Sequence, residues 1–116
     1  MTLHTEIANE IIECYGERLI DTPKQSHDAL TVSLANEVTL EIRIASSEEY
    51  SFQWKSGKET FRIDTAPLHP ELSTFPNHLH HSSGELQPDL LTTPGNPPWQ
   101  NVKQILDTIL ENPLLK

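Results

Sequence analysis

The stretch from residue 30 to residue 64 alternates between apolar and polar side chains with a period of two, and this pattern strongly restricts the fold. Such alternation is typical of strands that bury one face and expose the other. Short links, such as Ser-Gly-Lys at 56–58, indicate that successive strands pair as hairpins. We therefore expect an antiparallel four-stranded meander, with a five-stranded one as the alternative. Its apolar face would carry Leu30, Val32, Leu34, Val38, Leu40, Ile42, Ile44, Tyr50, Phe52, Trp54, Phe61 and Ile63.

The first residues show helical periodicity instead. Apolar side chains recur every three or four positions from Leu3 to Tyr15, and Gly16 follows as a helix stop. Cys14 lies on this stripe, so we expect it to be a small core residue rather than a nucleophile. Residues 18–20 are a candidate for a further short strand.

A second helical stripe lies near the end of the sequence. It begins after two prolines at 97 and 98 and ends before Pro113. Two amphipathic helices and a sheet with one apolar face can bury one another's apolar surfaces. We therefore expect the fold class to be α+β, with residues 1–116 forming a single two-layer domain that has the N-terminal and C-terminal helices on one face of the sheet.

Residues 65–98 contain no clear periodic element and are expected to form a long loop rich in proline and histidine after the last strand. The part up to His81 has apolar anchors and is expected to be ordered. The part from Ser82 to Pro98 is rich in serine, glycine, proline and threonine and is expected to be a mobile tether.

Charge and cysteine content restrict the class of protein. The formal net charge of −9 disfavours generic nucleic-acid binding, unless the few cations gather on one face. The polar face of the predicted sheet would gather Arg43, Lys55, Lys58 and Arg62. A single cysteine and the lack of a long apolar run favour a soluble cytoplasmic protein without a membrane partner.

The candidate site combines the last predicted strand with the histidines that follow it. Residues two apart on a strand share a face, and His78 and His80 have the same spacing in extended chain. Histidine can act as a general acid or base, and arginine can stabilise a phosphoryl transition state. These residue types suit a metal-independent ribonuclease that needs no cofactor. The candidate catalytic residues are Arg62, Asp64, His69, His78 and His80.

Two other interpretations of these residues stay open. Three histidines and a carboxylate could bind zinc or iron, although their spacing matches no zinc signature, so no metal ligand is assigned. The same histidines could also be ordinary surface residues. In that case the exposed sheet edge or polar face would serve a non-enzymatic protein–protein interaction module.

The middle third of the chain resembles the TumE-type toxin family of prokaryotic toxin–antitoxin systems. The resemblance implies a small cytoplasmic toxin encoded beside a helix-turn-helix antitoxin, with RNA as a target by analogy with other toxins. It carries over to the five candidate residues given above. The matching segments are Tyr50-Ser-Phe-Gln-Trp54, Phe61-Arg-Ile-Asp64, Ala66-Pro67, His69-Pro-Glu-Leu72, Thr74-Phe-Pro76 and His78-Leu-His80.

The chain departs from the family pattern at three positions. Leu68 and Asn77 stand where the family usually has histidine, and Thr65 replaces an asparagine. The expected partners are the helix-turn-helix antitoxin and RNA. The sequence leaves the oligomeric state open, with a homodimer among the alternatives.

Overall fold

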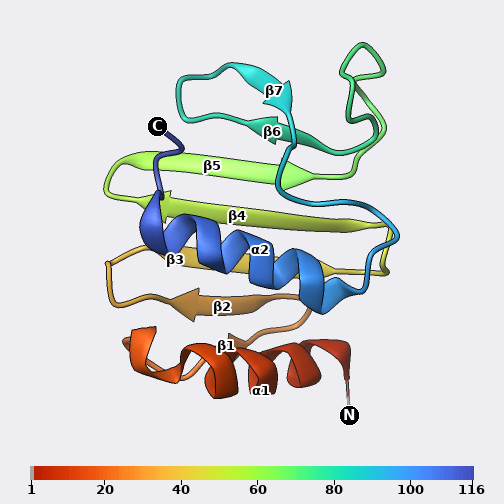
Figure 1. Cartoon of the computed structure of the whole chain (residues 1–116). Helices are drawn as coiled ribbons and strands as arrows, with labels where there is room; N and C mark the ends of the chain where they lie inside the picture. Colours follow the sequence, from red (N-terminus) through yellow and green to blue (C-terminus); the bar gives the residue numbers. More distant parts are fainter. Residues whose placement is uncertain (1) are drawn as a thin grey trace.

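The computed structural model describes residues 2–116 and contains one seven-stranded sheet with two α-helices (Figure 1). The strands follow one another in space in the order of the sequence, and every neighbouring pair is antiparallel. The elements are α1 (Leu3–Tyr15), a 3₁₀ turn η1 (Gly16–Arg18), β1 (Lys24–Gln25), β2 (Leu30–Ser33), β3 (Thr39–Ile44), β4 (Tyr50–Ser56), β5 (Glu59–Asp64), β6 (His78–His80), β7 (Leu86–Pro88) and α2 (Pro98–Glu111).

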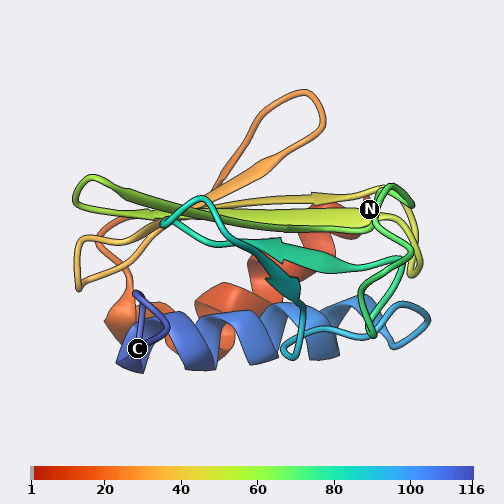
Figure 2. The same cartoon turned by 90° about the horizontal axis from the view of Figure 1, so that it is seen from above.

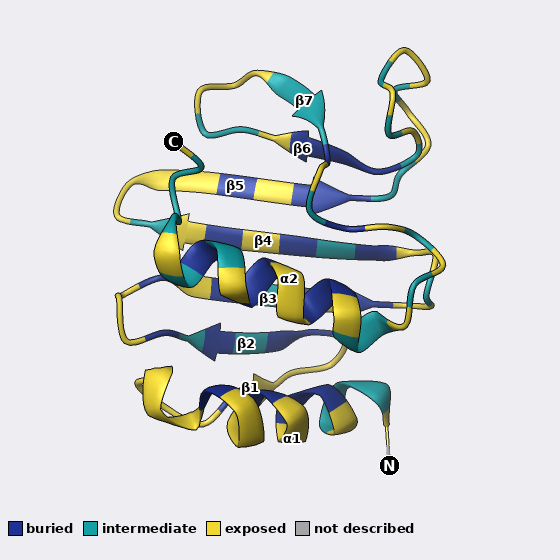
Figure 3. Cartoon of the chain, viewed as in Figure 1, coloured by how far each residue is buried: buried dark blue, intermediate teal, exposed yellow. Residues whose placement is uncertain are grey.

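The four central strands confirm the alternation of the sequence. In β3, β4 and β5, buried residues alternate with more exposed ones (Figure 3). The register places Phe52 opposite both Ile42 and Ile63, and Trp54 opposite Phe61, so the apolar side chains form continuous rows across the sheet. The rings of Trp54 and Phe61 stack with centroids 5.3 Å apart. These rows form the sheet's half of the hydrophobic core.

Both α-helices lie on the same side of the sheet, as expected (Figure 2). Helix α2 buries Val102, Ile105, Leu106 and Ile109 in the same core. The hydroxyl of Tyr15 on α1 donates a 2.5 Å hydrogen bond to Asp107 on α2, which joins the two helices. No helix within the described residues 2–116 lies on the opposite face of the sheet (Figure 2), which exposes its polar side chains.

The prediction that residues 65–98 form a long loop without strands is wrong, and so is the prediction of a sheet with only four or five strands. Strands β6 and β7 lie inside that region, and β6 pairs with β5. Each has three residues, which is too short for a period of two to be recognised. The proposed tether from 82 to 98 also holds the buried Asp89 and Thr92, so it is part of the packed structure.

Two smaller predictions are also wrong. Cys14 is exposed, because α1 turns Ile7, Ala8, Ile11 and Tyr15 toward the core and Tyr15 occupies the place next to Ile11. Residues 18–20 do not form a strand. Leu19 makes one isolated bridge with Leu34, and the chain pairs instead at β1.

No helix within residues 2–116 combines the length and the apolar character that crossing a membrane requires.

The packing of α2 leads to a stability prediction. Ile105 is fully buried between α2 and the sheet, so Ile105→Ala should lower the free energy of unfolding by about 2–5 kcal/mol through lost burial and a residual cavity. The neighbouring Gln104 is exposed, and Gln104→Ala should change it by less than about 0.5 kcal/mol. Urea denaturation of both variants measures the difference. Equal effects would contradict the packing of α2 described here.

Candidate functional site

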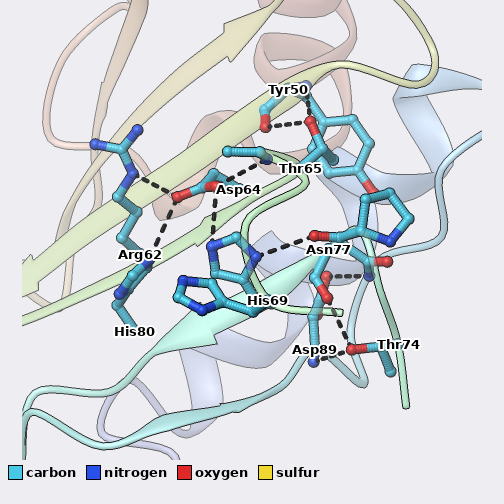
Figure 4. Close-up of polar contacts among 12 residues, drawn as sticks. Tyr50, Arg62, Asp64, Thr65, His69, Thr74, Asn77, His80 and Asp89 are labelled. Atoms are coloured by element: carbon cyan, nitrogen blue, oxygen red, sulfur yellow. Dashed lines mark hydrogen bonds and ion pairs between the residues drawn. The ribbon is translucent and has the colours of Figure 1, made fainter. Parts of the chain in front are cut away.

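The site is built by the pairing of β5 with β6. In this register Arg62 lies opposite His80, and Asp64 lies opposite His78. Residues two apart on a strand point to the same face, so all four side chains meet on one side of the sheet. Strand pairing therefore gathers residues that are well separated in the sequence, as Figure 4 shows.

The carboxylate of Asp64 is the centre of this cluster. Its Oδ2 lies 3.0 Å from Arg62 Nε and 3.5 Å from His80 Nε2. Its Oδ1 lies 3.0 Å from His78 Nε2 and accepts a 3.0 Å hydrogen bond from the backbone N–H of Ala66. Only 11% of the Asp64 side chain is exposed, so these contacts replace the water that a carboxylate would otherwise bind.

His78 and His80 have different environments. Only 2% of the His78 side chain is exposed, and its Nδ1 lies 3.0 Å from the carbonyl oxygen of Pro76. About half of the His80 side chain, 47%, is exposed. Burial lowers the pKa of His80, while the negative charge of Asp64 acts in the opposite direction. Within residues 2–116, no hydrogen-bond partner occupies His80 Nδ1.

His69 joins the cluster because the chain between β5 and β6 folds back over it. Its ring centroid lies 4.8 Å from that of His78 and 6.2 Å from that of His80, with the planes nearly perpendicular. Its Nδ1 lies 3.7 Å from a carboxylate oxygen of Glu71. The structure therefore brings together all five predicted residues, although His69 makes no direct contact with Asp64.

A groove runs along the sheet beside Asp64. Its volume is about 790 Å³, and its lining includes Arg43, Tyr50, Arg62, Asp64 and Pro76. Arg62 is 48% exposed there, and its guanidinium contacts Asp64 only through Nε. Arg62 and His80 are thus the members of the cluster with the most exposed side chains. The terminal nitrogens of Arg62 point away from Asp64 (Figure 4).

The polar face of the sheet carries less positive charge than the predicted gathering of cations implied. Arg43 lies 2.7 Å from Glu41 and 3.6 Å from Asp28, and Arg62 is paired with Asp64. Carboxylates partly neutralise both arginines, so this face is a mixed surface rather than a basic patch.

The spacing of the Asp64 cluster also suits a metal ion. Asp64, His78 and His80 each offer one ligand atom, and these atoms lie within 4.8 Å of one another. Imidazole nitrogen and carboxylate oxygen are common ligands of zinc and iron.

A second polar cluster, which sequence reasoning missed, anchors the same chain segment on the helix side. The amide nitrogen of Asn77 donates to Asp89 at 2.8 Å and to the carbonyl oxygen of Thr92 at 3.0 Å. Asp89 also accepts hydrogen bonds from the hydroxyl and the backbone N–H of Thr92. Thr74 Oγ1 accepts from the backbone N–H of Asp89. The Asp-x-x-Thr spacing at 89–92, which favours local capping hydrogen bonds, was the available signal.

Two of the departures from the family pattern have structural roles. Asn77 is 4% exposed and is one of the members of this buried cluster. Thr65 Oγ1 accepts a 3.0 Å hydrogen bond from the backbone N–H of Tyr50 and donates to its carbonyl oxygen, which extends the pairing of β4 and β5. Leu68, by contrast, is exposed and outside both clusters.

The buried cluster predicts an unusual response to alkaline pH. The hydroxyls of Tyr50 and Thr92 are 2.7 Å apart, and burial raises the pKa of Tyr50 to about 12. Tyr50→Phe should cost about 1 kcal/mol at pH 7 through the lost hydrogen bond. Between pH 10 and 12 the wild-type protein loses stability because its unfolded chain releases the Tyr50 proton and the folded chain keeps it. The difference in the free energy of unfolding between wild type and Tyr50→Phe should therefore become smaller in this pH range. Urea denaturation measures this difference.

Thr92→Val is the matched control for this experiment. It removes the Thr92 hydroxyl, which contacts both Tyr50 and Asp89, but keeps the tyrosine. The difference in the free energy of unfolding between wild type and Thr92→Val should therefore not narrow above pH 10. If wild type and Tyr50→Phe differ in the free energy of unfolding by the same amount at pH 7 and at pH 11.5, this result would contradict the raised pKa of Tyr50.

Comparison with known proteins supports the resemblance found in the middle of the sequence. A family model described as Toxin TumE matches residues 6–112, which is nearly the whole chain and extends well beyond the segments that carry the resemblance. No curated protein and no solved structure gives a significant match. The match covers both helices' core-facing residues, the sheet and the complete Asp64 cluster. The protein therefore belongs to the TumE toxin family.

Proposed function

We propose that the protein is the toxin component of a toxin–antitoxin system and that it acts on RNA through the Asp64 cluster. Membership of the TumE family supports the toxin role. One observation carries the proposed action on RNA. Asp64 holds Arg62 and His80 side by side, each about half exposed, and Arg62 and Asp64 also line the groove.

The cluster contains the parts needed for RNA cleavage without a metal. The contact between Asp64 and His80 Nε2 would orient the ring so that Nδ1 faces a substrate, as in other carboxylate–histidine pairs. His80 Nδ1 would take the proton of a ribose 2′-hydroxyl. The 2′ oxygen would then attack the adjacent phosphorus, and the bond from phosphorus to the 5′ oxygen would break. The products would be a 2′,3′-cyclic phosphate and a 5′-hydroxyl.

Arg62 and His69 suit the two remaining roles. The terminal guanidinium nitrogens of Arg62 would stabilise the negative charge that develops on the phosphoryl oxygens. His69, whose Nδ1 lies near Glu71, would donate the proton that the leaving 5′ oxygen needs. Its ring centroid is 6.2 Å from that of His80, so the proposed acid and base lie close to each other.

His78 has a positioning role in this proposal. Its buried ring fills the space between Asp64, the Pro76 carbonyl and His69, so it cannot reach a substrate. Because the net charge of the protein is −9, long-range electrostatic attraction would not hold RNA. Local contacts would hold it instead, with Arg62 binding phosphate and the groove binding bases.

Expression in cells tests the toxin role. Overproduction without an antitoxin should arrest growth, and His80→Ala should relieve the arrest because it removes the base. The readout is colony formation upon induction, with protein level and thermal unfolding measured for each variant. His27→Ala is the control, since His27 is an exposed histidine outside the cluster. Normal growth with abundant soluble wild-type protein would refute the proposal.

Purified protein tests the chemistry. Incubation with RNA in EDTA should yield fragments with 2′,3′-cyclic phosphate ends, and His80→Ala should lower the cleavage rate by about 10²–10⁴-fold. Fragment ends can be identified by mass spectrometry. Cleavage that vanishes in EDTA, or products with 3′-hydroxyl ends, would exclude this mechanism.

The uncovered polar face supports a second function, a non-enzymatic interaction module. In the described part of the chain no helix covers this face (Figure 2), and side chains of both charges lie around the groove. The partner we propose for this face is a helix-turn-helix antitoxin. That the protein forms a homodimer stays a prediction. A stoichiometric co-purified partner, together with unchanged growth and intact RNA, would favour this function over the enzyme.

A further inference from the structure

We propose that Asp64, His78 and His80 form a zinc-binding site. This inference does not rest on the proposed action on RNA. It follows from the hydrogen-bonding needs of His78, from the ligand geometry and from the groups that hold the ligands in place.

Both ring nitrogens of His78 face groups that only accept hydrogen bonds. Nδ1 lies 3.0 Å from the Pro76 carbonyl oxygen, and Nε2 lies 3.0 Å from Asp64 Oδ1. A neutral imidazole has one N–H, so it can donate to only one of these oxygens. With Nδ1–H bound to Pro76, the lone pair of Nε2 points at a carboxylate oxygen, and only 2% of the His78 side chain is exposed. A metal ion between Nε2 and Oδ1 would bind both atoms and remove their repulsion.

The surroundings of the pair favour a metal ion. His80 Nε2 points at the same carboxylate from the exposed side, and the three ligand atoms lie within 4.8 Å of one another. Two imidazole nitrogens and one carboxylate oxygen are a common set for zinc with an open fourth position. Magnesium and calcium prefer oxygen ligands, so this set disfavours them. His69 or a water molecule would complete the shell, since the His69 ring lies 4.8 Å from that of His78.

The ligands are also supported by outer contacts that metal sites need. The carbonyl of Pro76 would fix the ring of His78 with Nε2 toward the metal, and Arg62 Nε would hold Asp64 Oδ2 while Oδ1 binds the ion. Ala66 N–H fixes Oδ1 as well. Each of these contacts is present between residues of this chain.

Zinc would oppose the RNA chemistry proposed above. An imidazole that binds zinc through Nε2 carries its remaining proton on Nδ1, so His80 could no longer take a proton there. Zinc binding and metal-free cleavage are therefore competing states of one cluster, and each can be tested without the other.

Metal titration of tag-free, metal-free protein tests the site. Zn²⁺ should bind by calorimetry with one site per chain, and Co²⁺ should give the intense visible absorption of tetrahedral coordination. His80→Ala and Asp64→Asn should each weaken Zn²⁺ binding at least tenfold. His27→Ala, the exposed control, should bind as the wild type does. His80→Ala removes a half-exposed ring and is the variant expected to stay folded if Asp64→Asn does not.

Three results would overturn the inference. The first is wild-type affinity for Zn²⁺ no tighter than that of folded His80→Ala. The second is equal loss of binding in His27→Ala. The third is an imidazole ¹⁵N spectrum in which the His78 resonances do not change when Zn²⁺ is in excess. Zinc binding without RNA cleavage would refute the proposed function alone, and cleavage in EDTA without zinc binding would refute the zinc site alone.

Discussion

The carboxylate of Asp64 is the interaction on which the site depends. It contacts two histidines, an arginine and a backbone N–H. Asp64 is also the last residue of β5, and the loop that leads to β6 begins directly after it. Removing such a buried carboxylate would leave its partners without a common acceptor. The charge of one side chain thus sets the directions of Arg62, His78 and His80, which belong to two paired strands.

A second buried carboxylate holds the other side of the same loop. Asp89 binds Asn77 and the residues at 91 and 92, and Asn77 immediately precedes His78. The segment from 65 to 77 is therefore fixed at its start by Asp64 and at its end by Asp89. This explains how a proline-rich connection can lay His69 over His78 without regular secondary structure of its own.

The sequence predicted the parts of the molecule in which a repeating pattern was long enough to read. The alternation from 30 to 64 correctly predicted that Arg62 and Asp64 share a face. The spacing of His78 and His80 predicted that both rings could aim at one point, and in the structure both lie near Asp64. Strands β6 and β7 were missed because three residues cannot establish a period. The second polar cluster, around Asp89, was missed because its members come together only in three dimensions. The prediction that Cys14 is a core residue was wrong because Tyr15, rather than Cys14, packs into the core.

The order of the strands has a consequence for how the protein is made. Every strand pairs with its neighbours in sequence, so the sheet can grow one hairpin at a time as the chain leaves the ribosome. Arg62 and Asp64 emerge before their partners on β6, and α2, which seals the apolar face, emerges after all seven strands. A nascent chain that ends before residue 78 lacks both histidines of β6. The cluster therefore cannot assemble until β6 has been made, and a chain that stops before β6 does not carry it.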